Sequence, residues 1–330
     1  EFRRVLFRSE TIIKIYYKKS ILYGVSEMKR KISLNQMKIT IIICINLISF
    51  LCYNNYFIIK VYAGNEVTTE MTENNSLSEN NSKVKQDKSE NIKNYFSYEG
   101  DPFADDISLL SQYLYEQSIG EMPKGADGRK VAYLTFDDGP SETITCRILD
   151  ILKEENIKAT FFVIGRSVEG SEKNQQIIKR MAREGHSIGN HTYSHNYDYL
   201  YPNSSVNVYN FISDIEKTNS ILKGVLGDKF STRVIRCPGG HMSWKNMKCL
   251  DKVLKSNQYY QVDWNSLSKD AEGKKKNADE LLDNVIKTLG DKEKAIILMH
   301  DTYSKEETVK ALPMVIKYLK DNGYEFRTIR

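Results

Sequence analysis

Hydrophobic and polar positions follow two alternating rhythms from about residue 121 to the C-terminus. Short continuous apolar runs, typical of buried parallel strands, occupy residues 131–136, 159–164, 186–191, 233–237, 259–264, 295–300 and 324–329. Amphipathic stretches with helical spacing separate them, at residues 142–155, 172–184, 205–226, 244–256, 277–290 and 304–322. Strands alternating with helices predict parallel βα units, arranged either as a doubly wound sheet or as a closed barrel.

The N-terminal part of the chain has a different pattern. Residues 1–9 read EFRRVLFRS, which resembles translated adapter sequence, and we interpret residues 1–27 as a non-native or untranslated leader. A basic segment and an apolar run at 39–52 then predict an export signal over residues 28–64, with small residues before a cleavage point at Ala63. Residues 39–59 are also long enough to be an uncleaved membrane anchor. Either alternative predicts an extracellular or cell-envelope protein.

Residues 65–120 are predicted to be a disordered spacer, with one short helix, between this segment and the catalytic domain at 121–330. Residues 65–93 are rich in Asn, Ser, Glu, Thr and Lys, and bury too little apolar surface to offset the entropy of ordering. The apolar positions of residues 106–118 have helical spacing and predict a short helix.

Charge and cysteine content narrow the classes of partner. The net charge of +5 is too small to indicate nucleic-acid binding, and Lys is interleaved with Glu and Asp as on a solvated surface. We expect no nucleic-acid partner, membrane contact only through the N-terminal segment, and a monomer.

The five cysteines do not have zinc-knuckle spacing, so we expect free thiols at Cys146, Cys237 and Cys249, with a Cys237–Cys249 disulfide as the alternative.

Polar motifs follow the predicted strands. Asp137 and Asp138 end the first strand, where two adjacent carboxylates repel each other unless a cation or a proton compensates. His191 and His195, four residues apart after the third strand, have spacing that can converge on one metal ion. Taken singly, the first motif is equally well a plain turn and the second a pair of ordinary histidines.

Three more motifs follow later strands. Arg236 precedes a Pro-Gly-Gly turn, and an Arg can hold a neighbouring carboxylate ionised. Asp270 comes after the fifth strand, and His300 ends the sixth and is a candidate general acid. All these candidates lie at the C-terminal ends of strands, where the active sites of βα barrels assemble, and this shared face favours the barrel and a common site.

The motifs TFDDG, HTYSH, RCPGG, the segment from Trp264 to Asp270, and LMH resemble, in order and spacing, the polysaccharide deacetylases of the NodB-like carbohydrate esterases. The resemblance covers residues 121–330 and implies a distorted (β/α) barrel of about seven βα units with one divalent metal, zinc before cobalt or nickel. It implies that the metal ligands are Asp138, His191 and His195. It also implies that Asp137 is the base, oriented by Arg236, and that His300 is the acid, paired with the carboxylate of Asp270. The implied substrate or oxyanion contacts are Gly239, Leu298 and Trp264.

Three positions, in two of the motifs, depart from the family pattern. Gly239 stands where the family often has an aromatic residue, and Leu267 and Ala271 replace an Asp and a Trp of the fourth motif. The acetyl pocket is therefore expected to be more open. The resemblance implies removal of acetyl groups from an amino-sugar polymer, with peptidoglycan N-acetylglucosamine expected first. Chitin-like oligomers, acetylated xylan, and a non-catalytic carbohydrate-binding protein of the same fold are the alternatives.

Overall fold

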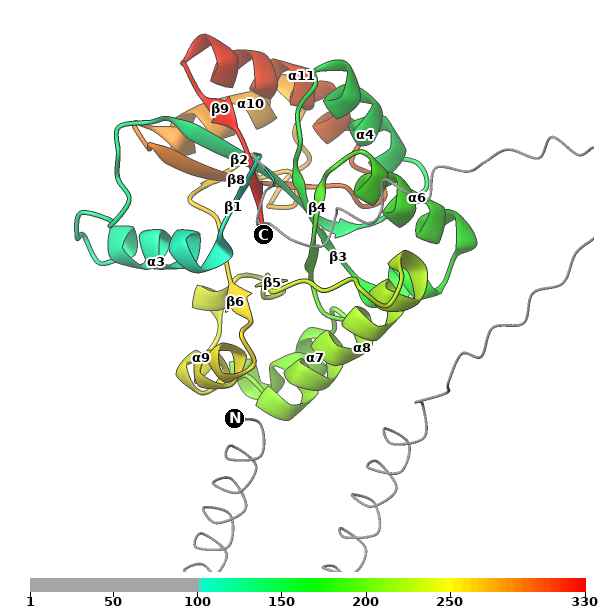
Figure 1. The fold of residues 1–330 in the computed structure, drawn as a ribbon. Helices are drawn as coiled ribbons and strands as arrows, with labels where there is room; N and C mark the ends of the chain where they lie inside the picture. The colour runs from blue at the N-terminus through cyan, green and yellow to red at the C-terminus, as the bar shows by residue number, and fades with distance from the viewer. Residues whose placement is uncertain (1–100, 102) are drawn as a thin grey trace, which may run out of the picture. The chain divides into compact units, whose positions relative to one another are not determined.

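A computed structural model describes residue 101 and residues 103–330. Its centre is an eight-stranded parallel sheet in which seven strands run in the order β6-β5-β4-β3-β2-β8-β7 and β9 also pairs with β2 (Figure 1). The strands are β2 (Val131–Gly139), β3 (Thr160–Val163), β4 (Ser187–Asn190), β5 (Val234–Ile235), β6 (Tyr260–Gln261), β7 (Ser266–Leu267), β8 (Lys294–His300) and β9 (Glu325–Phe326). Among the described strands, β6 and β7 end the order without pairing with each other, so the sheet is a curled half-barrel. The predicted distorted βα barrel is confirmed in this form.

Helices surround the sheet (Figure 1). They are α4 (Thr145–Glu154), α5 (Gly165–Glu169), α6 (Glu172–Arg183), α7 (Tyr197–Leu200), α8 (Val208–Leu226), α9 (Met247–Ser256), α10 (Ala278–Leu289) and α11 (Glu306–Asp321). Short 3-10 turns lie at Pro202–Ser204 and His241–Ser243. Each of the six helical stretches expected from the sequence contains one of the six longest of these helices.

Alternation along the strands assigns each side chain to one face of the sheet. In β2, Ala132 and Leu134 join the core cluster that packs under the helices, whereas Val131 and Tyr133 join the cluster on the other face. In β8, Ile297 joins the cluster on the helix side, whereas its neighbour Ile296 joins the cluster on the other face. Because side chains two residues apart share a face, the inner face is continued by Thr135 and Asp137 in β2 and by Leu298 and His300 in β8.

The segment before residue 121 packs onto this domain. Strand β1 (Ala104–Asp105) pairs with β10 (Thr328–Ile329), and helix α3 (Ile107–Ser118) agrees with the helix expected at 106–118. Ile107 and Leu110 of α3 are buried in the inner-face cluster. The packed part of the chain therefore extends upstream of residue 121.

Several elements differ from the expectation. The run 324–329 is not one strand, since β9 pairs with β2 and β10 pairs with β1. Arg327 lies between the two strands, and its guanidinium donates to Asp105 of β1. Strands β1 and β7 and the short helices α5 and α7 are too short for a periodic pattern and were not expected.

Cys146, Cys237 and Cys249 are free thiols, as expected. Within the described residues, none of the helices has the length and apolar character needed to cross a bilayer. The predicted leader, the predicted signal or anchor, and residues 65–100 of the predicted spacer lie outside the described residues.

Candidate active site

Asp137 is held by a buried arginine. Arg236 is completely buried, and its Nη1 donates to Oδ1 of Asp137 at 2.9 Å and to the Thr135 hydroxyl at 2.7 Å. The remaining guanidinium groups donate to the main-chain oxygens of Val262 and Asp263, so the arginine is fixed in one orientation. A planar guanidinium held by four hydrogen bonds fixes the neighbouring carboxylate in place. The structure thus joins the two residues that the sequence placed at separate strand ends.

Asp138, His191 and His195 form a cluster whose ligand atoms all lie within 4.8 Å of one another. Oδ1 of Asp138 lies 3.4 Å from Nε2 of His191 and 3.1 Å from Nε2 of His195. Burial opposes ionisation of Asp138, but the two imidazoles outweigh it and hold the pKa of this carboxyl well below its usual range. Burial likewise opposes a charge on His191, and the carboxylates of Asp137 and Asp138 overcome it and raise the pKa of that imidazole.

The donor set fits a divalent cation. Nδ1 of His191 lies 2.8 Å from the main-chain oxygen of Arg236, which can only accept, so Nδ1 carries the proton and Nε2 is left as the ligand atom. Oδ1 of Asp138 is buried and has no hydrogen-bond partner among the described residues. One carboxylate and two imidazoles suit zinc and leave coordination positions for water or substrate, as in catalytic sites.

Irregular backbone aims two of these side chains. The register of β2 with β3 shifts between Asp137 and Gly139, and Asp138 at this bulge has a φ of 71°. Bulges next to active sites redirect a side chain, here turning Asp138 away from the face that strict alternation would give it. His195 also has a positive φ, of 46°, in the loop after β4. Non-glycine residues in this region are strained and cluster at functional sites.

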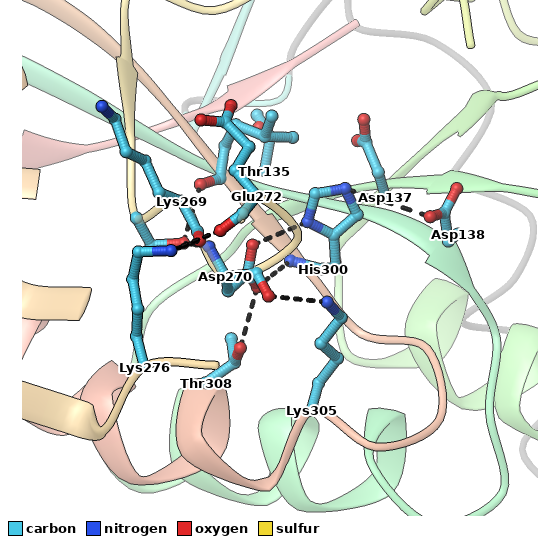
Figure 2. Close-up of polar contacts among 12 residues, drawn as sticks. Thr135, Asp137, Asp138, Lys269, Asp270, Glu272, Lys276, His300, Lys305 and Thr308 are labelled. Carbon is cyan, nitrogen blue, oxygen red and sulfur yellow. Dashed lines mark hydrogen bonds and ion pairs between the residues drawn. The ribbon is translucent and has the colours of Figure 1, made fainter. Parts of the chain in front are cut away.

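His300 and Asp270 form a second buried pair (Figure 2). Nδ1 of His300 lies 2.8 Å from Oδ1 of Asp270, and the Thr308 hydroxyl donates to Oδ2 of the same carboxylate at 2.8 Å. Burial disfavours the charged imidazolium, but the hydrogen bond and the charge of Asp270 outweigh it and raise the pKa of His300 to about 9. The other ring nitrogen of His300 lies 3.9 Å from Oδ2 of Asp138, so the imidazolium faces the cluster.

The three predicted substrate or oxyanion residues border the same region. Leu298 is 5% exposed, pairs in register with Thr135 and Leu267, and is in phase with His300 on the inner face. Gly239 is exposed at the turn after β5 with a φ of 76°, and its N–H makes no backbone hydrogen bond within the described part of the chain. Trp264 lies against the next residue of that turn, 3.0 Å from the position of a Cβ on Gly240.

Sequence reasoning missed residues that support these groups. Thr308 is a single hydroxyl in an otherwise ordinary segment, and Thr135 belongs to the TFDDG motif but was assigned no role from it. Asp301 is completely buried, accepts from the Thr145 hydroxyl at 2.7 Å, and would collide with any side chain at position 139. The available signal was its place directly after His300, since a carboxylate close to other carboxylates needs a cation or a proton to compensate its charge.

Comparisons with known proteins agree with this geometry. The profile of the family described as polysaccharide deacetylase matches residues 124–261. A peptidoglycan-N-acetylglucosamine deacetylase of Bacillus cereus is 34% identical over 225 residues, which are 65% of this chain and 77% of that protein. A CE4 esterase of Streptococcus mutans is similar in structure, with a TM-score of 0.64 and 32% identity over 71% of this chain and 95% of that one.

A further similar structure is the catalytic domain of the peptidoglycan N-acetylglucosamine deacetylase of Eubacterium rectale, with a TM-score of 0.54 and 32% identity over 62% of this chain and 90% of that one. Sequence identity above 30%, a shared fold and a buried carboxylate–imidazole site lead to the same assignment. The chain belongs to the polysaccharide deacetylase family and is an amide-hydrolysing deacetylase.

Proposed function

We propose that this enzyme removes acetyl groups from N-acetylglucosamine residues of peptidoglycan with the help of one divalent cation. Zinc is the cation that we expect first. The observation that carries the proposal is the position of Asp138. Its two oxygens face the imidazoles of His191 and His195 on one side and the imidazolium of His300 on the other. A cation ligand and a proton donor thus lie around one small space, as hydrolysis of an amide requires.

Asp138, His191 and His195 would hold the cation. When bound, a cation at this position supplies Lewis-acid chemistry, which polarises the acetamide carbonyl and acidifies water. Asp137 is the base in this proposal: Arg236 occupies its Oδ1, and its Oδ2 lies 3.7 Å from Nε2 of His191 and can take a proton from the attacking water. The fixed orientation of the carboxylate lowers the entropic cost of that proton transfer.

His300 is the acid. Its raised pKa keeps the imidazole charged at neutral pH, so Nε2 can give a proton to the amine that leaves when the C–N bond breaks. Asp270 stabilises the imidazolium and fixes the ring orientation. The Gly239 N–H donates to the carbonyl oxygen as negative charge develops there, and Leu298 forms an apolar wall for the acetyl methyl. The products are acetate and a free amino sugar.

The choice of polymer rests on the named relatives, two of which are peptidoglycan-N-acetylglucosamine deacetylases. A location outside the cell membrane or at the envelope, reached through the predicted signal or anchor, fits such a substrate. Acetate release from peptidoglycan, chitin oligomers and acetylxylan, measured side by side with and without a chelator, tests the proposal. Fastest release from peptidoglycan that stops with chelator and returns with zinc supports it. A preference for either other polymer, or activity unaffected by chelator, contradicts it.

A further inference from the structure

The turn after β5 is enclosed by aromatic side chains that come from elsewhere in the chain. A Cβ built on Gly239 would lie 3.1 Å from Cζ2 of Trp244 and 3.4 Å from the hydroxyl oxygen of Tyr197. The φ of 76° independently favours glycine at this position. The space that a side chain of residue 239 would enter, beside the cation cluster, is therefore already occupied by Tyr197 and Trp244.

Trp244 is a fixed support. Its indole N–H donates to the main-chain oxygen of Pro238 at 2.8 Å, and its ring stacks on Tyr201 at 4.1 Å with an interplanar angle of 6°. The Tyr197 ring packs edge-on against Trp244, at 5.2 Å between ring centroids. The centroid of the Tyr197 ring also lies 5.4 Å from that of His195. The tyrosine thus bridges the aromatic support and the cation cluster.

Tyr197 keeps an exposed surface although its ring packs against Trp244 and His195. Its exposed fraction is 45%, and its hydroxyl makes no hydrogen bond to any other residue in the described part of the chain. A rigid ring with an apolar face and a polar tip is suited to ligands that are themselves amphipathic. A pyranose ring is such a ligand, because it has C–H groups on its faces and hydroxyls around its edge.

We propose that Tyr197 is a specificity-determining residue of the deacetylase, whose ring packs on the sugar that carries the acetamide and whose hydroxyl hydrogen-bonds to that sugar. The inference rests on the proposed function, because it requires an amino-sugar substrate. It deepens that function by naming the group that recognises the sugar ring rather than the acetyl group.

The test compares a probe that contains a sugar with one that lacks it, on the zinc-loaded full chain. The sugar probe is the N-acetylglucosamine tetramer, followed by acetate release and by calorimetric binding. The probe without sugar is acetohydroxamic acid, an acetyl compound that binds zinc, followed by inhibition. Tyr197→Ala should raise KM and Kd for the tetramer about tenfold, equivalent to the loss of one well-packed aromatic contact, and leave inhibition by acetohydroxamic acid unchanged.

Tyr199→Ala is the matched control, because Tyr199 lies in the same helix α7 and is 39% exposed. It should leave both probes within about twofold of the wild type. Tyr197→Phe separates the two contacts and should raise KM by about threefold, since the ring remains and one hydrogen bond is lost. If Tyr197→Ala does not fold, Tyr197→Leu replaces it, because leucine keeps the apolar packing against Trp244 and removes the ring.

An unchanged tetramer KM in Tyr197→Ala or Tyr197→Leu overturns the inference, and so does an equal loss for both probes, which would show damage to the cation cluster. Failure of the proposed function looks different. In that case the wild type binds acetohydroxamic acid but neither binds nor deacetylates N-acetylglucosamine oligomers and peptidoglycan, and the inference falls with it.

Discussion

Asp270 receives two hydrogen bonds from His300, one from ring Nδ1 and one from the main-chain N–H, each at 2.8 Å. The carboxylate therefore fixes both the backbone and the ring of the same residue. Burial opposes its ionisation, but the bonds from His300 and Thr308 outweigh it and lower the pKa of Asp270. The pair is consequently charged on both sides over the neutral range.

Asp270→Asn should move the alkaline limb of kcat/KM to lower pH. The variant loses the charge that raises the pKa of His300 to about 9, and burial then favours the neutral ring. The limb should shift down by about two units, towards the ordinary histidine value of about 6.5. Zinc content should not change, because neither residue belongs to the cation cluster. The pH dependence of kcat/KM on one soluble substrate, with zinc measured in both proteins, checks this.

Thr308→Val is the matched control for that experiment. It removes one hydrogen bond to Asp270 and leaves the carboxylate charge in place. Its alkaline limb should stay within about half a unit of the wild type. If Asp270→Asn also leaves the limb in place with full activity, the pairing has no catalytic role and Asp270 only orders the loop after β7.

His195→Ala should abolish zinc binding and activity while the fold persists. The imidazole is one of three candidate ligands, its side chain is 19% exposed, and it contributes little to the core. Zinc stoichiometry, acetate release and the circular dichroism spectrum give the three readings. His241→Ala, which removes an imidazole bonded to Asp251 outside the cluster, should keep full zinc content. Stoichiometric zinc and turnover in His195→Ala would show the ligand assignment to be wrong.

The strand phase explains which site residues the sequence could predict. Asp137, Arg236 and His300 continue the inner-face alternation of Val131, Val234 and Ile296, so their convergence follows from placing strands correctly. Asp138 and His195 do not follow from phase, because a bulge and positive φ values aim them. Their residue types and spacing suggested the roles, but their directions depend on backbone irregularities that no periodic pattern encodes.

Contacts between residues far apart in the sequence also could not be predicted from it. Tyr197, Trp244 and Gly239 meet because a helix, a turn and a strand end come together around one space. Likewise, α3 was expected as a helix, but its packing against the sheet depends on apolar positions in several strands. Such contacts are set by the tertiary fold and have no local signal.

A chain that begins at Asp101 should retain full activity on soluble oligomers, because residues 65–93 are predicted to be dispensable. A chain that begins at Glu121 should be destabilised by several kcal/mol, since it lacks Ile107 and Leu110, each worth about 1.5–3 kcal/mol when buried. It also lacks Asp105, which accepts from the Tyr133 hydroxyl at 2.6 Å. Urea denaturation and acetate release from both chains test this. Misfolding of the Asp101 chain would rule out a dispensable spacer.

Arg236→Met should destabilise the protein by about 3–5 kcal/mol, the usual cost of removing one partner of a buried ion pair. Asp137 would keep a buried carboxyl group without its partner, and the Thr135 hydroxyl and the oxygens of Val262 and Asp263 would lose their donor. Arg233→Met serves as a control. Arg233 lies at the other end of β5, is partly exposed and pairs with Asp106, so its removal should cost about 1 kcal/mol of stability. Equal costs for the two variants, read from urea denaturation, would contradict the role of Arg236.

Asp301 should make the stability of the cation-free protein depend on pH in a way that Asp301→Asn removes. Burial raises the pKa of this carboxyl to about 7, and the charges of Asp138 and Asp137 add to it against the opposing hydrogen bond from Thr145. The ordinary unfolded value is about 3.9, so the native state binds more protons between these two values and is penalised as pH rises. The penalty is absent below about pH 4, grows through the interval and is complete above about pH 7.

An asparagine at position 301 keeps an acceptor for Thr145 and carries no charge. The free energy of unfolding of Asp301→Asn relative to wild type should therefore rise between about pH 4 and pH 7, by up to a few kcal/mol, and then level off. Any constant cost of fitting the amide shifts both ends equally and leaves this slope intact. The measurement is urea denaturation of both proteins in chelator, because a bound cation would offset the charges of Asp137 and Asp138. A difference that stays constant across this interval would show that Asp301 does not titrate there, and its burial beside two carboxylates would then need compensation from another group.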